Sequence, residues 1–292
     1  MKLWQLFLAF GLFFCVYSVS VIADTDSTCT LKPQETLTIG CTYECGFFNE
    51  WAISSQAKEL NYKVKTIDLT QNKTLLTQLD GVIIPGGADI HPNWYNTHLE
   101  DPYRSQLKNL ASFYKKTPEG PRRDQFEFDF LKQYFQHPQS TTLPLLGICR
   151  GMQALTVSQG IPLYIDIKKQ LGIPNRMYTL DKVSITDDSS LIKQLFSQEK
   201  FWAVELHHQA LNLDYFNQYK NRWPHLKLSA FSNDHKIVEA LEFKNRPILG
   251  VQFHPEYTFG HTRTQTFSWL LTKACEHKNQ KQKTILLSKG DQ

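Results

Sequence analysis

The 292-residue chain has little net charge: its 32 Lys and Arg residues against 28 Asp and Glu residues leave a formal charge of +4 at pH 7. The basic residues are spread along the chain except for a cluster near the C-terminus, so the charge balance gives no support for nucleic-acid binding. The sequence has no internal repeat and no low-complexity tract. With 41% hydrophobic and 13% aromatic residues it is too apolar for a disordered chain. One large globular domain is the simplest interpretation.

The N-terminus carries a targeting pattern. Lys2 is followed by the apolar run "LWQLFLAFGLFFCVYSVSVIA", which ends before Asp24. A short positive region, an apolar run and small or short residues before the break are typical of a secretory signal peptide. We therefore expect residues 1–23 to be a signal peptide and the protein to be exported: periplasmic or secreted, or lysosomal or extracellular if the source is eukaryotic.

The alternative for the same run is an uncleaved anchor, because its length is close to that of a bilayer span. Cys15 follows Phe13 and Phe14, which are too bulky for the usual lipoprotein cleavage site. We expect export without a lipid and without a lasting membrane anchor.

Cysteine is scarce, with six residues in the chain. Signal removal would leave an odd number, so at least one thiol would stay unpaired in an exported protein, and we expect it to be Cys149. Disulfides are expected, with no pairing assigned, among Cys29, Cys41, Cys45 and Cys275. An extended segment would hold Cys41 and Cys45 too far apart to bridge, so a bond between them needs a turn.

Strand and helix patterns alternate after residue 36, which favours an α/β fold. A mostly parallel central sheet covered by helices on both faces, a three-layer sandwich, follows from this alternation. Strands are predicted at 37–43, 62–69, 81–87 and 142–149, and helices at 49–60, 123–136 and 150–159. Short strands are predicted in the second half at "IPLYIDI", "KVSIT", "LKLSAFS", "IVEALEF" and "PILGVQF".

The predicted organisation is simple. Residues 24–35 form an N-terminal segment, residues 36–275 form one domain, and residues 276–292 form a loosely held basic tail. Residues 92–121 are rich in Pro, Asn, Asp and Tyr and are expected to form a long excursion. A final helix is expected from His261 to about Lys278.

The stretch "LLGICRGMQ" (145–153) places a cysteine where a strand runs directly into a helix. Gly147 and Gly151 flank Cys149 at a spacing that permits a sharp turn, which would hold a nucleophile on a strained elbow above the sheet. The helix N-terminus favours a thiolate, and the backbone N–H of Arg150 points to where an oxyanion would form. The alternative is a buried core cysteine, and the local pattern alone leaves the two nearly tied.

A base for this cysteine is found far away in the chain. In "GVQFHPEY" (250–257) an apolar strand ends at His254, and Pro255 forces an extended turn that puts the carboxylate of Glu256 within reach of the imidazole. Such a carboxylate orients the ring and stabilises the imidazolium. In "IIPGGADIHP", Gly86 and Gly87 follow a strand and let backbone N–H groups approach a reacting carbonyl closely. Taken alone, each of these stretches is equally compatible with a plain turn.

The three stretches "PGGADIHP", "GICRGMQ" and "GVQFHPEY", in this order and at these distances, resemble those of the class I glutamine amidotransferase fold, a flavodoxin-like sandwich. Within it the chain resembles the γ-glutamyl hydrolase group, peptidase family C26. The stretches "RRDQFEFDFL", "GIPLYIDI" and "HHQALNL" are similar to the branch that includes γ-glutamyl-γ-aminobutyrate hydrolases. The resemblance covers about residues 35–272. The signal peptide and the extra cysteines depart from many cytoplasmic members.

The resemblance implies roles for particular residues. Cys149 would be the nucleophile, His254 the general base and acid, and Glu256 the residue that orients it. The backbone N–H groups of Gly87 and Arg150 would form the oxyanion hole. The residues implied to line the substrate pocket are Gly86, Gln153, His208 and Gln209.

An Arg123–Asp124 pair is also shared with the family and is interpreted as structural, closing the excursion onto the following helix. No cofactor is implied. No metal is needed, and no metal-ligand set is visible in the sequence, because the paired His207 and His208 lack a spaced third ligand.

The implied activity is hydrolysis of a γ-glutamyl amide in a small molecule or peptide, through a thioester on Cys149. Folyl polyglutamates, γ-glutamyl amines, poly-γ-glutamate and γ-linked cell-wall peptides all carry this bond. Selectivity among them is expected to reside in the 92–121 excursion and the loop around "MYTLDK" (177–182). The alternatives are a glutaminase subunit that passes ammonia to a synthetase, and a catalytically silent member that binds a ligand or a protein.

Overall fold

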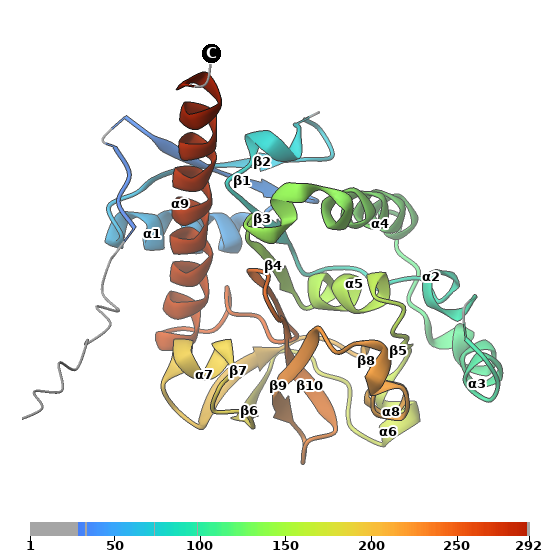
Figure 1. Ribbon diagram of the computed structural model, residues 1–292. Helices are drawn as coiled ribbons and strands as arrows, with labels where there is room; N and C mark the ends of the chain where they lie inside the picture. The colour runs from blue at the N-terminus through green and yellow to red at the C-terminus, as the bar shows by residue number, and fades with distance from the viewer. Residues whose placement is uncertain (1–28, 33, 73, 98, 291–292) are drawn as a thin grey trace, which may run out of the picture.

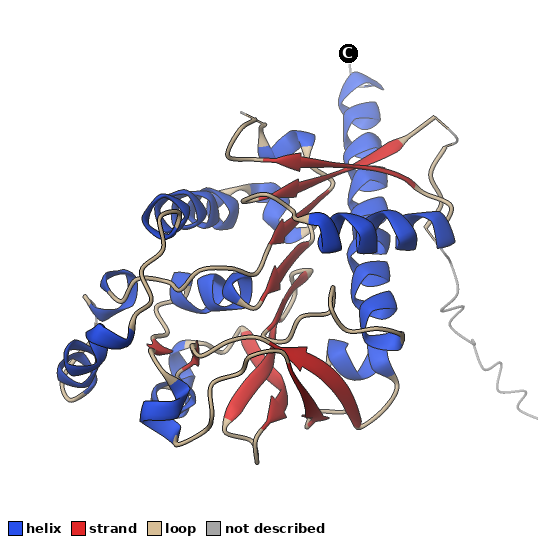
Figure 2. Ribbon diagram, turned by 180° about the vertical axis from the view of Figure 1, so that it is seen from behind, coloured by secondary structure: helices blue, strands red, loops and turns tan. Residues whose placement is uncertain are grey.

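A computed structural model describes residues 29–32, 34–72, 74–97 and 99–290. The predicted signal peptide, residues 1–23, lies outside the described residues. A nine-stranded sheet runs through the molecule in the order β2-β1-β3-β4-β11-β10-β9-β6-β7 (Figures 1 and 2). Five strands at one end of this order are parallel: β2 (Lys63–Asp68), β1 (Thr36–Cys41), β3 (Gly81–Ile84), β4 (Leu145–Ile148) and β11 (Ile248–Val251). This half confirms the predicted parallel sheet.

The other end of the sheet is antiparallel. It is formed by β10 (Ile237–Phe243), β9 (Leu226–Ser232), β6 (Thr179–Ile185) and β7 (Lys200–Glu205). A separate two-stranded sheet pairs β5 (Leu163–Tyr164) with β8 (Ala210–Leu211). Of the strand predicted at "IPLYIDI" (161–167), only Leu163 and Tyr164 form a strand in the structure.

Helices cover both faces of the parallel half, as predicted, and each face has its own hydrophobic core. Helices α1 (Phe47–Glu59) and α9 (His261–Gly290) pack on one face, and α4 (Gly120–Gln136) and α5 (Arg150–Ser158) lie on the other (Figure 1). In β4, Leu146 and Ile148 join the core under α1 and α9, whereas Leu145 joins the core under α5. Successive strand residues point to opposite faces, so a fully apolar strand supplies both cores.

The shorter helices lie in the connections. The 92–121 excursion contains α2 (Asn93–Asn96) and α3 (Tyr103–Leu110), which extend beyond α4 and α5 in Figure 1. The second half contains α6 (Ile167–Leu171), α7 (Leu191–Phe196) and α8 (Leu213–Gln218). No helix in the described part of the chain combines the length and the hydropathy of a membrane span.

Strand β7 was not predicted from the sequence. Phe201, Ala203 and Glu205 face inward, and Lys200 and Trp202 face solvent. The strand has a single neighbour, β6, at the edge of the sheet. An exposed tryptophan and a buried glutamate reverse the apolar and polar alternation by which a half-buried strand is recognised.

The expected end of the last helix was wrong. Helix α9 continues from His261 to Gly290, through residues that we predicted to be a loose basic tail. Nζ of Lys278 and Nζ of Lys281 lie 3.1 and 2.8 Å from the two carboxylate oxygens of Asp80, which is buried. The basic residues of this segment therefore bind the carboxylate that precedes β3, and the helix keeps its contact with the domain.

Two disulfides are present among the described cysteines, and Cys149 is free, as predicted. Cys29 pairs with Cys275 and ties the N-terminal segment to α9. Cys41 pairs with Cys45 across a bend that directly follows β1, with 5.3 Å between their Cα atoms. The turn that this pairing requires is thus supplied by the end of the strand.

Loss of the Cys29–Cys275 disulfide should lower stability measurably, because the bond closes a loop of 246 residues in the unfolded chain. The double variant Cys29→Ser, Cys275→Ser should have a free energy of unfolding about 2 to 4 kcal/mol below that of the oxidised protein, measured in urea. Cys149→Ser, which lies outside both disulfides, is the control and should stay within about 1 kcal/mol. Equal stability of the double variant and the oxidised protein would contradict the pairing.

Candidate active site

The three predicted motifs meet at one edge of the sheet because their strands are neighbours. In the order β3-β4-β11, Ile84 lies opposite Gly147, and Ile148 lies opposite Val251. These strands are parallel, so the segments that follow them leave at the same edge. The glycine loop, Cys149 and the segment leading to His254 therefore come together, although they are far apart in sequence.

Cys149 itself forms the turn between β4 and α5. Its backbone has φ 50° and ψ −104°, a conformation that a non-glycine residue rarely adopts. Its N–H donates to the carbonyl of Val251 at 2.7 Å, and its Sγ lies 3.8 Å from the carbonyl oxygen of Leu206. The thiol is thus held on a strained elbow at the N-terminus of α5.

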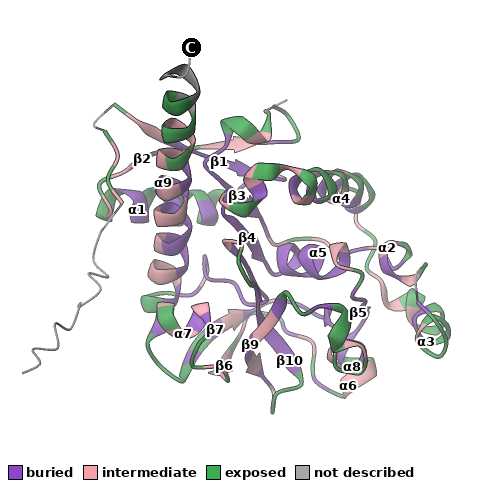
Figure 3. Cartoon of the chain, in the orientation of Figure 1, coloured by how far each residue is buried: buried purple, intermediate pink, exposed green. Residues whose placement is uncertain are grey.

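The flanking glycines have a different role from the predicted one. The positive φ belongs to Cys149, and Gly147 and Gly151 are needed for close packing. A Cβ on Gly151 would lie 2.0 Å from the carbonyl oxygen of Ile84, and one on Gly147 would lie 2.7 Å from the backbone of Gly151. Helix α5 is buried almost along its whole length, as Figure 3 shows, because these glycines let it approach β3 and β4.

His254 and Glu256 form the hydrogen-bonded pair predicted from the sequence. Nδ1 of His254 lies 2.6 Å from Oε1 of Glu256, and both side chains are buried. Nε2 of His254 has no hydrogen-bond partner among the described residues. Burial opposes a charged imidazole, but the Glu256 carboxylate and the Cys149 thiolate together raise the pKa of His254 well above its usual value. The ring is therefore suited to hold a proton next to the thiol.

Gly86 lies against both His254 and Cys149. A Cβ added to Gly86 would come within 2.8 Å of Cε1 of His254 and 3.7 Å of Cβ of Cys149. The imidazole and the thiol thus flank the same position in the glycine loop. Only a residue without a side chain leaves room for the ring there.

Two buried arginines hold the carbonyl groups of the glycine loop. Arg123 donates to the carbonyls of Pro85 and Gly86, at 2.5 and 2.9 Å, and Arg150 donates to that of Ala88 at 2.8 Å. In a trans peptide the N–H points opposite to the C=O, so the N–H of Gly87 points away from Arg123. Neither this N–H nor that of Arg150 donates a hydrogen bond to another described residue. Both remain available to an oxyanion.

The arginines are themselves held by carboxylates of α4. Arg123 pairs with Glu127 at 2.7 Å, and Arg150 pairs with Asp124 at 2.7 Å and with Glu127 at 3.1 Å. All four side chains are buried, and burial raises the pKa of Asp124 against the opposing effect of Arg150. Asp124 also accepts from the N–H of His91 and so closes the start of the excursion, as predicted; the role of Arg123 in the glycine loop was not predicted.

The other predicted pocket residues bind the protein itself. Gln153 donates its amide to the carbonyl of Gln209 at 2.9 Å. His208 lies between two carboxylates, with Nε2 2.8 Å from Asp89 and Nδ1 3.4 Å from Asp166. The side chain of Gln209 accepts from the N–H of Ile90 at 3.0 Å. These residues brace the loop after β3, and their contact with substrate stays a prediction.

A group of aromatic side chains at the edge of the site was not predicted. We call Phe48, Tyr178 and Tyr257 the aromatic rim. The ring of Tyr257 stacks on His254 at 5.2 Å and contacts Phe48 at 4.9 Å, and Tyr178 lies 6.3 Å from it. Phe48 and Tyr178 are 47% and 69% exposed, so the rim presents apolar surface beside the imidazole. Tyr178 belongs to the "MYTLDK" loop, which was expected to influence selectivity.

A second group missed in the sequence is a buried cluster of Glu205, His207 and Glu239. The premise that His207 lacks further potential ligands was wrong, because Glu205 lies two residues before it and the fold brings the distant Glu239 to both. No spacing rule could have found this cluster, since its members lie on β7, on the loop that follows and on β10.

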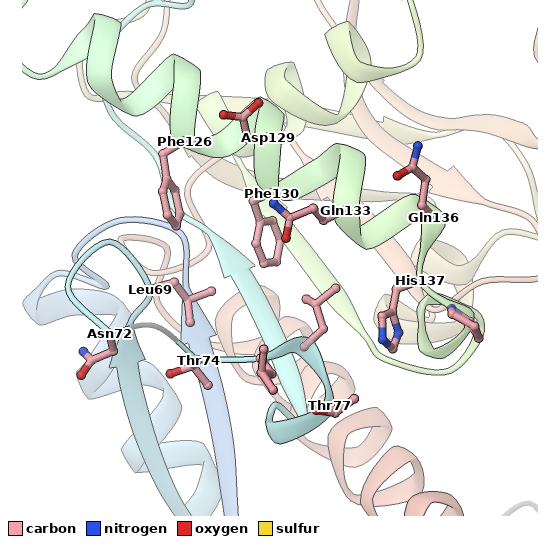
Figure 4. A pocket seen from close by; sticks show the side chains of 13 residues that line it. Leu69, Asn72, Thr74, Thr77, Phe126, Asp129, Phe130, Gln133, Gln136 and His137 are labelled. Carbon is pink, nitrogen blue, oxygen red and sulfur yellow. The ribbon is translucent and has the colours of Figure 1, made fainter.

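A cavity of about 740 Å³ lies elsewhere, between α4 and residues 69–72 and 74–77 (Figure 4). Its lining includes Leu69, Phe126 and Phe130, and none of the predicted site residues. Helix α4 therefore lies between two different environments: its Arg123 binds the glycine loop, and its Phe126 and Phe130 face this cavity.

The fold is similar to that of solved structures, one of them a glutaminase domain. The glutaminase domain of a Trypanosoma brucei CTPS with bound acivicin matches with a TM-score of 0.57 at 16% identity, over 82% of this chain and 94% of that one. A Thermoplasma acidophilum protein assigned to GMP synthase matches with a TM-score of 0.55 at 19% identity, over 85% and 99%. The fold is that of the class I glutamine amidotransferase-like proteins.

Sequence comparison identifies the family of this chain within the class. The Peptidase C26 family profile matches residues 56–256, so the chain belongs to this family. The glutamine amidotransferase-like protein YvdE of Lactococcus lactis is 31% identical over 202 residues, 66% of this chain and 73% of that protein. The γ-glutamyl-γ-aminobutyrate hydrolase PuuD of Escherichia coli is 26% identical over 218 residues, 70% and 74% of the two chains.

Gly86→Ala should displace the His254 ring, because the added Cβ would lie 2.8 Å from Cε1 and the hydrogen bond to Glu256 restrains the ring. We expect the rate of Cys149 alkylation by iodoacetamide at neutral pH to fall by about 10- to 100-fold, the effect of a misplaced catalytic group. Gly120→Ala is the control, because its Cβ would come no closer than 3.2 Å to another atom. An unchanged rate in Gly86→Ala would show that His254 does not act on the thiol.

Glu256→Gln should lower the pKa of His254, because it removes the neighbouring carboxylate. The stability contributed by a charged His254 is present below the unfolded-state pKa, about 6.5, and is lost as the pH rises through its higher folded-state pKa. The wild type should therefore exceed Glu256→Gln in unfolding free energy most strongly below about pH 6.5. Urea unfolding over a pH series measures this difference, and a gap that widens with rising pH would refute the ion pair.

Proposed function

We propose that the protein hydrolyses γ-glutamyl amide bonds with Cys149 as nucleophile, His254 as general base and acid, and Glu256 as the residue that orients His254. The observation that carries the proposal is the meeting of the three motifs: Cys149 is held on a strained elbow, and the paired His254 flanks the same glycine as the thiol. Membership of the Peptidase C26 family and similarity to a γ-glutamyl-γ-aminobutyrate hydrolase support it.

The proposed reaction has two steps. The Cys149 thiolate attacks the amide carbon, and the resulting oxyanion accepts hydrogen bonds from the N–H groups of Gly87 and Arg150. His254 gives its proton to the departing amine, which leaves a γ-glutamyl thioester. His254 then removes a proton from water as the water attacks the thioester, the C–S bond breaks, and glutamate and the free thiol are released.

The aromatic rim favours a substrate whose leaving group is larger than ammonia. Its rings lie beside His254, the residue that would protonate the departing amine. Exposed apolar surface at that position is suited to the apolar part of an amine or to an extended peptide. Release of ammonia alone would leave this surface without a substrate contact, so the rim supports a γ-glutamyl amide with a larger leaving group.

We further propose that the protein is exported, and that the substrate is met outside the cytoplasm. The N-terminal sequence pattern supports export, and so do the two disulfides, since disulfides persist in oxidising compartments. A synthetase partner that uses ATP is not expected in such a compartment.

Cys149→Ser should reduce hydrolysis of a γ-glutamyl anilide by roughly 10³-fold or more, because a serine hydroxyl is a much weaker nucleophile beside the same base. Release of the aniline by purified protein without residues 1–23 measures the activity, and circular dichroism of the variant checks its fold. Retained turnover in Cys149→Ser would exclude the thioester. Faster hydrolysis of free glutamine than of any γ-glutamyl amide would favour the glutaminase alternative, and a Cys149 inert to iodoacetamide would favour a silent binding member.

A further inference from the structure

The cluster of Glu205, His207 and Glu239 lies in the interior, outside the proposed catalytic residues. Each residue offers a ligand atom, and these atoms lie within 4.8 Å of one another. Glu205 and Glu239 are fully buried, and His207 is 6% exposed. Glu205 ends β7, His207 follows it, and Glu239 lies in the middle of β10. The cluster thus joins the edge of the antiparallel half of the sheet to a central strand.

The orientation of His207 is fixed by its backbone contact. Nδ1 lies 2.9 Å from the carbonyl oxygen of Gln209, and a carbonyl can only accept, so Nδ1 carries the proton. Because Nδ1 carries the proton, Nε2 of the neutral ring offers a lone pair. Nε2 lies 3.1 Å from Oε2 of Glu205. A lone pair and a carboxylate oxygen repel each other at this distance unless a proton or a cation lies between them.

The remaining polar atoms of the cluster have no hydrogen-bond partners among the described residues. These atoms are both carboxylate oxygens of Glu205, Oε2 of Glu239 and Nε2 of His207. The other oxygen of Glu239 accepts from the hydroxyl of Ser232 at 2.7 Å. His207 and Glu239 are therefore each held from behind by one hydrogen bond while their free atoms face the cluster. Protein ligands of metal ions are typically oriented in this way.

The charges of the cluster are not balanced by neighbouring basic groups. The basic groups that act on Glu205 are His254 and Arg176, and these are already paired with Glu256 and with Asp181, at 2.6 and 2.8 Å. Either protons neutralise the two carboxylates, or two ionised carboxylates in this interior need two positive charges, which a single divalent cation supplies.

We propose that Glu205, His207 and Glu239 bind one divalent transition-metal ion of the Zn²⁺ class. One imidazole nitrogen and carboxylate oxygens suit such an ion, which binds them at about 2.0 to 2.2 Å. Two donors on one ion at that distance lie roughly 3 to 4 Å apart. The separation of 3.1 Å between His207 Nε2 and Glu205 Oε2 fits this requirement.

The ion positions the catalytic site and takes no part in the proposed reaction. Two of its ligands, Glu205 and His207, lie on either side of Leu206, and the chain continues from them to Gln209. The carbonyl of Leu206 lies 3.8 Å from Sγ of Cys149, and the side chain of Gln209 bonds the backbone of Ile90 in the loop after β3. The inference does not rest on the proposed function, because it would hold for a binding protein with the same fold.

Metal content tests the proposal directly. Untagged protein without residues 1–23 is treated with a chelator, incubated with Zn²⁺, desalted and measured by elemental mass spectrometry. We expect about one Zn²⁺ per chain and a melting temperature at least about 3 °C higher than that of the chelated protein, since a ligand that binds only the folded state stabilises it. Incubation with Co²⁺ in place of Zn²⁺ should give visible d–d absorption.

Isosteric variants locate the ion. Glu205→Gln and Glu239→Gln should each lower the bound Zn²⁺ to about a tenth of the wild-type content or less. Two variants are used so that the test still holds if one of them does not fold. Glu242→Gln is the matched control: it lies on the same strand and is buried, but its oxygens accept from Leu191, Ile192 and Ser229. It should keep the full metal content.

Two results would overturn the proposal. Wild-type protein that retains less than about a tenth of an equivalent of Zn²⁺ and shows no shift in melting temperature would mean that protons neutralise the cluster. Full metal content in both Glu205→Gln and Glu239→Gln would place the ion elsewhere, with His208, Asp89 and Asp166 as the next set of side chains to test.

Discussion

The glycine loop depends on the buried ion pairs between two arginines and two carboxylates. Arg123 of α4 and Arg150 at the start of α5 pair with Asp124 and Glu127 of α4, and the four charges sum to zero. Removal of one partner would leave an uncompensated buried charge, which costs about 3 to 5 kcal/mol. The same guanidinium groups bind the loop carbonyls. One network therefore both neutralises the buried charges and orients the N–H of Gly87. Buried ion pairs therefore support the backbone that would form the predicted oxyanion hole.

The rest of the site joins the two halves of the sheet. The parallel half supplies the glycine loop and Cys149, and β11 leads to His254 at the border with the antiparallel half. The N–H of His254 donates to Val204 of β7 at 2.9 Å, and the Cys149 thiol lies against Leu206, just beyond the same strand. An edge strand with one neighbour in the sheet is thus in contact with both catalytic candidates. The pairing that holds β7 in register with β6 therefore also holds the segment against which the thiol and the imidazole lie.

The sequence allowed the parallel half of the fold and the triad to be predicted, because both depend on local patterns. Apolar strands that are followed by glycine, cysteine or histidine indicate where candidate catalytic residues lie at the edge of the sheet. Neighbouring parallel strands bring those residues together. The antiparallel half was harder, since β7 carries an exposed Trp202 and a buried Glu205. The supporting contacts could not be predicted, because they join residues far apart in the sequence. Arg123 of α4 binds carbonyls of the loop after β3, and Glu239 of β10 lies close to Glu205 of β7. The extension of α9 depends likewise on Asp80, about 200 residues earlier in the chain.

The pairing of the cysteines bears on how a catalytic thiol could function in an oxidising compartment. Disulfide exchange requires that a thiol reach another sulfur, and a low-pKa, accessible thiol is the usual target of oxidation. Here Cys41 pairs with a residue four positions away, and Cys29 pairs with Cys275 on α9, so Cys149 has no free cysteine as a partner among the described residues. Cys149 is also 4% exposed, with Gly86 and His254 packed beside it. The close packing that aligns the thiol with its base also restricts the approach of a second sulfur, so export and thiol catalysis are compatible in this fold.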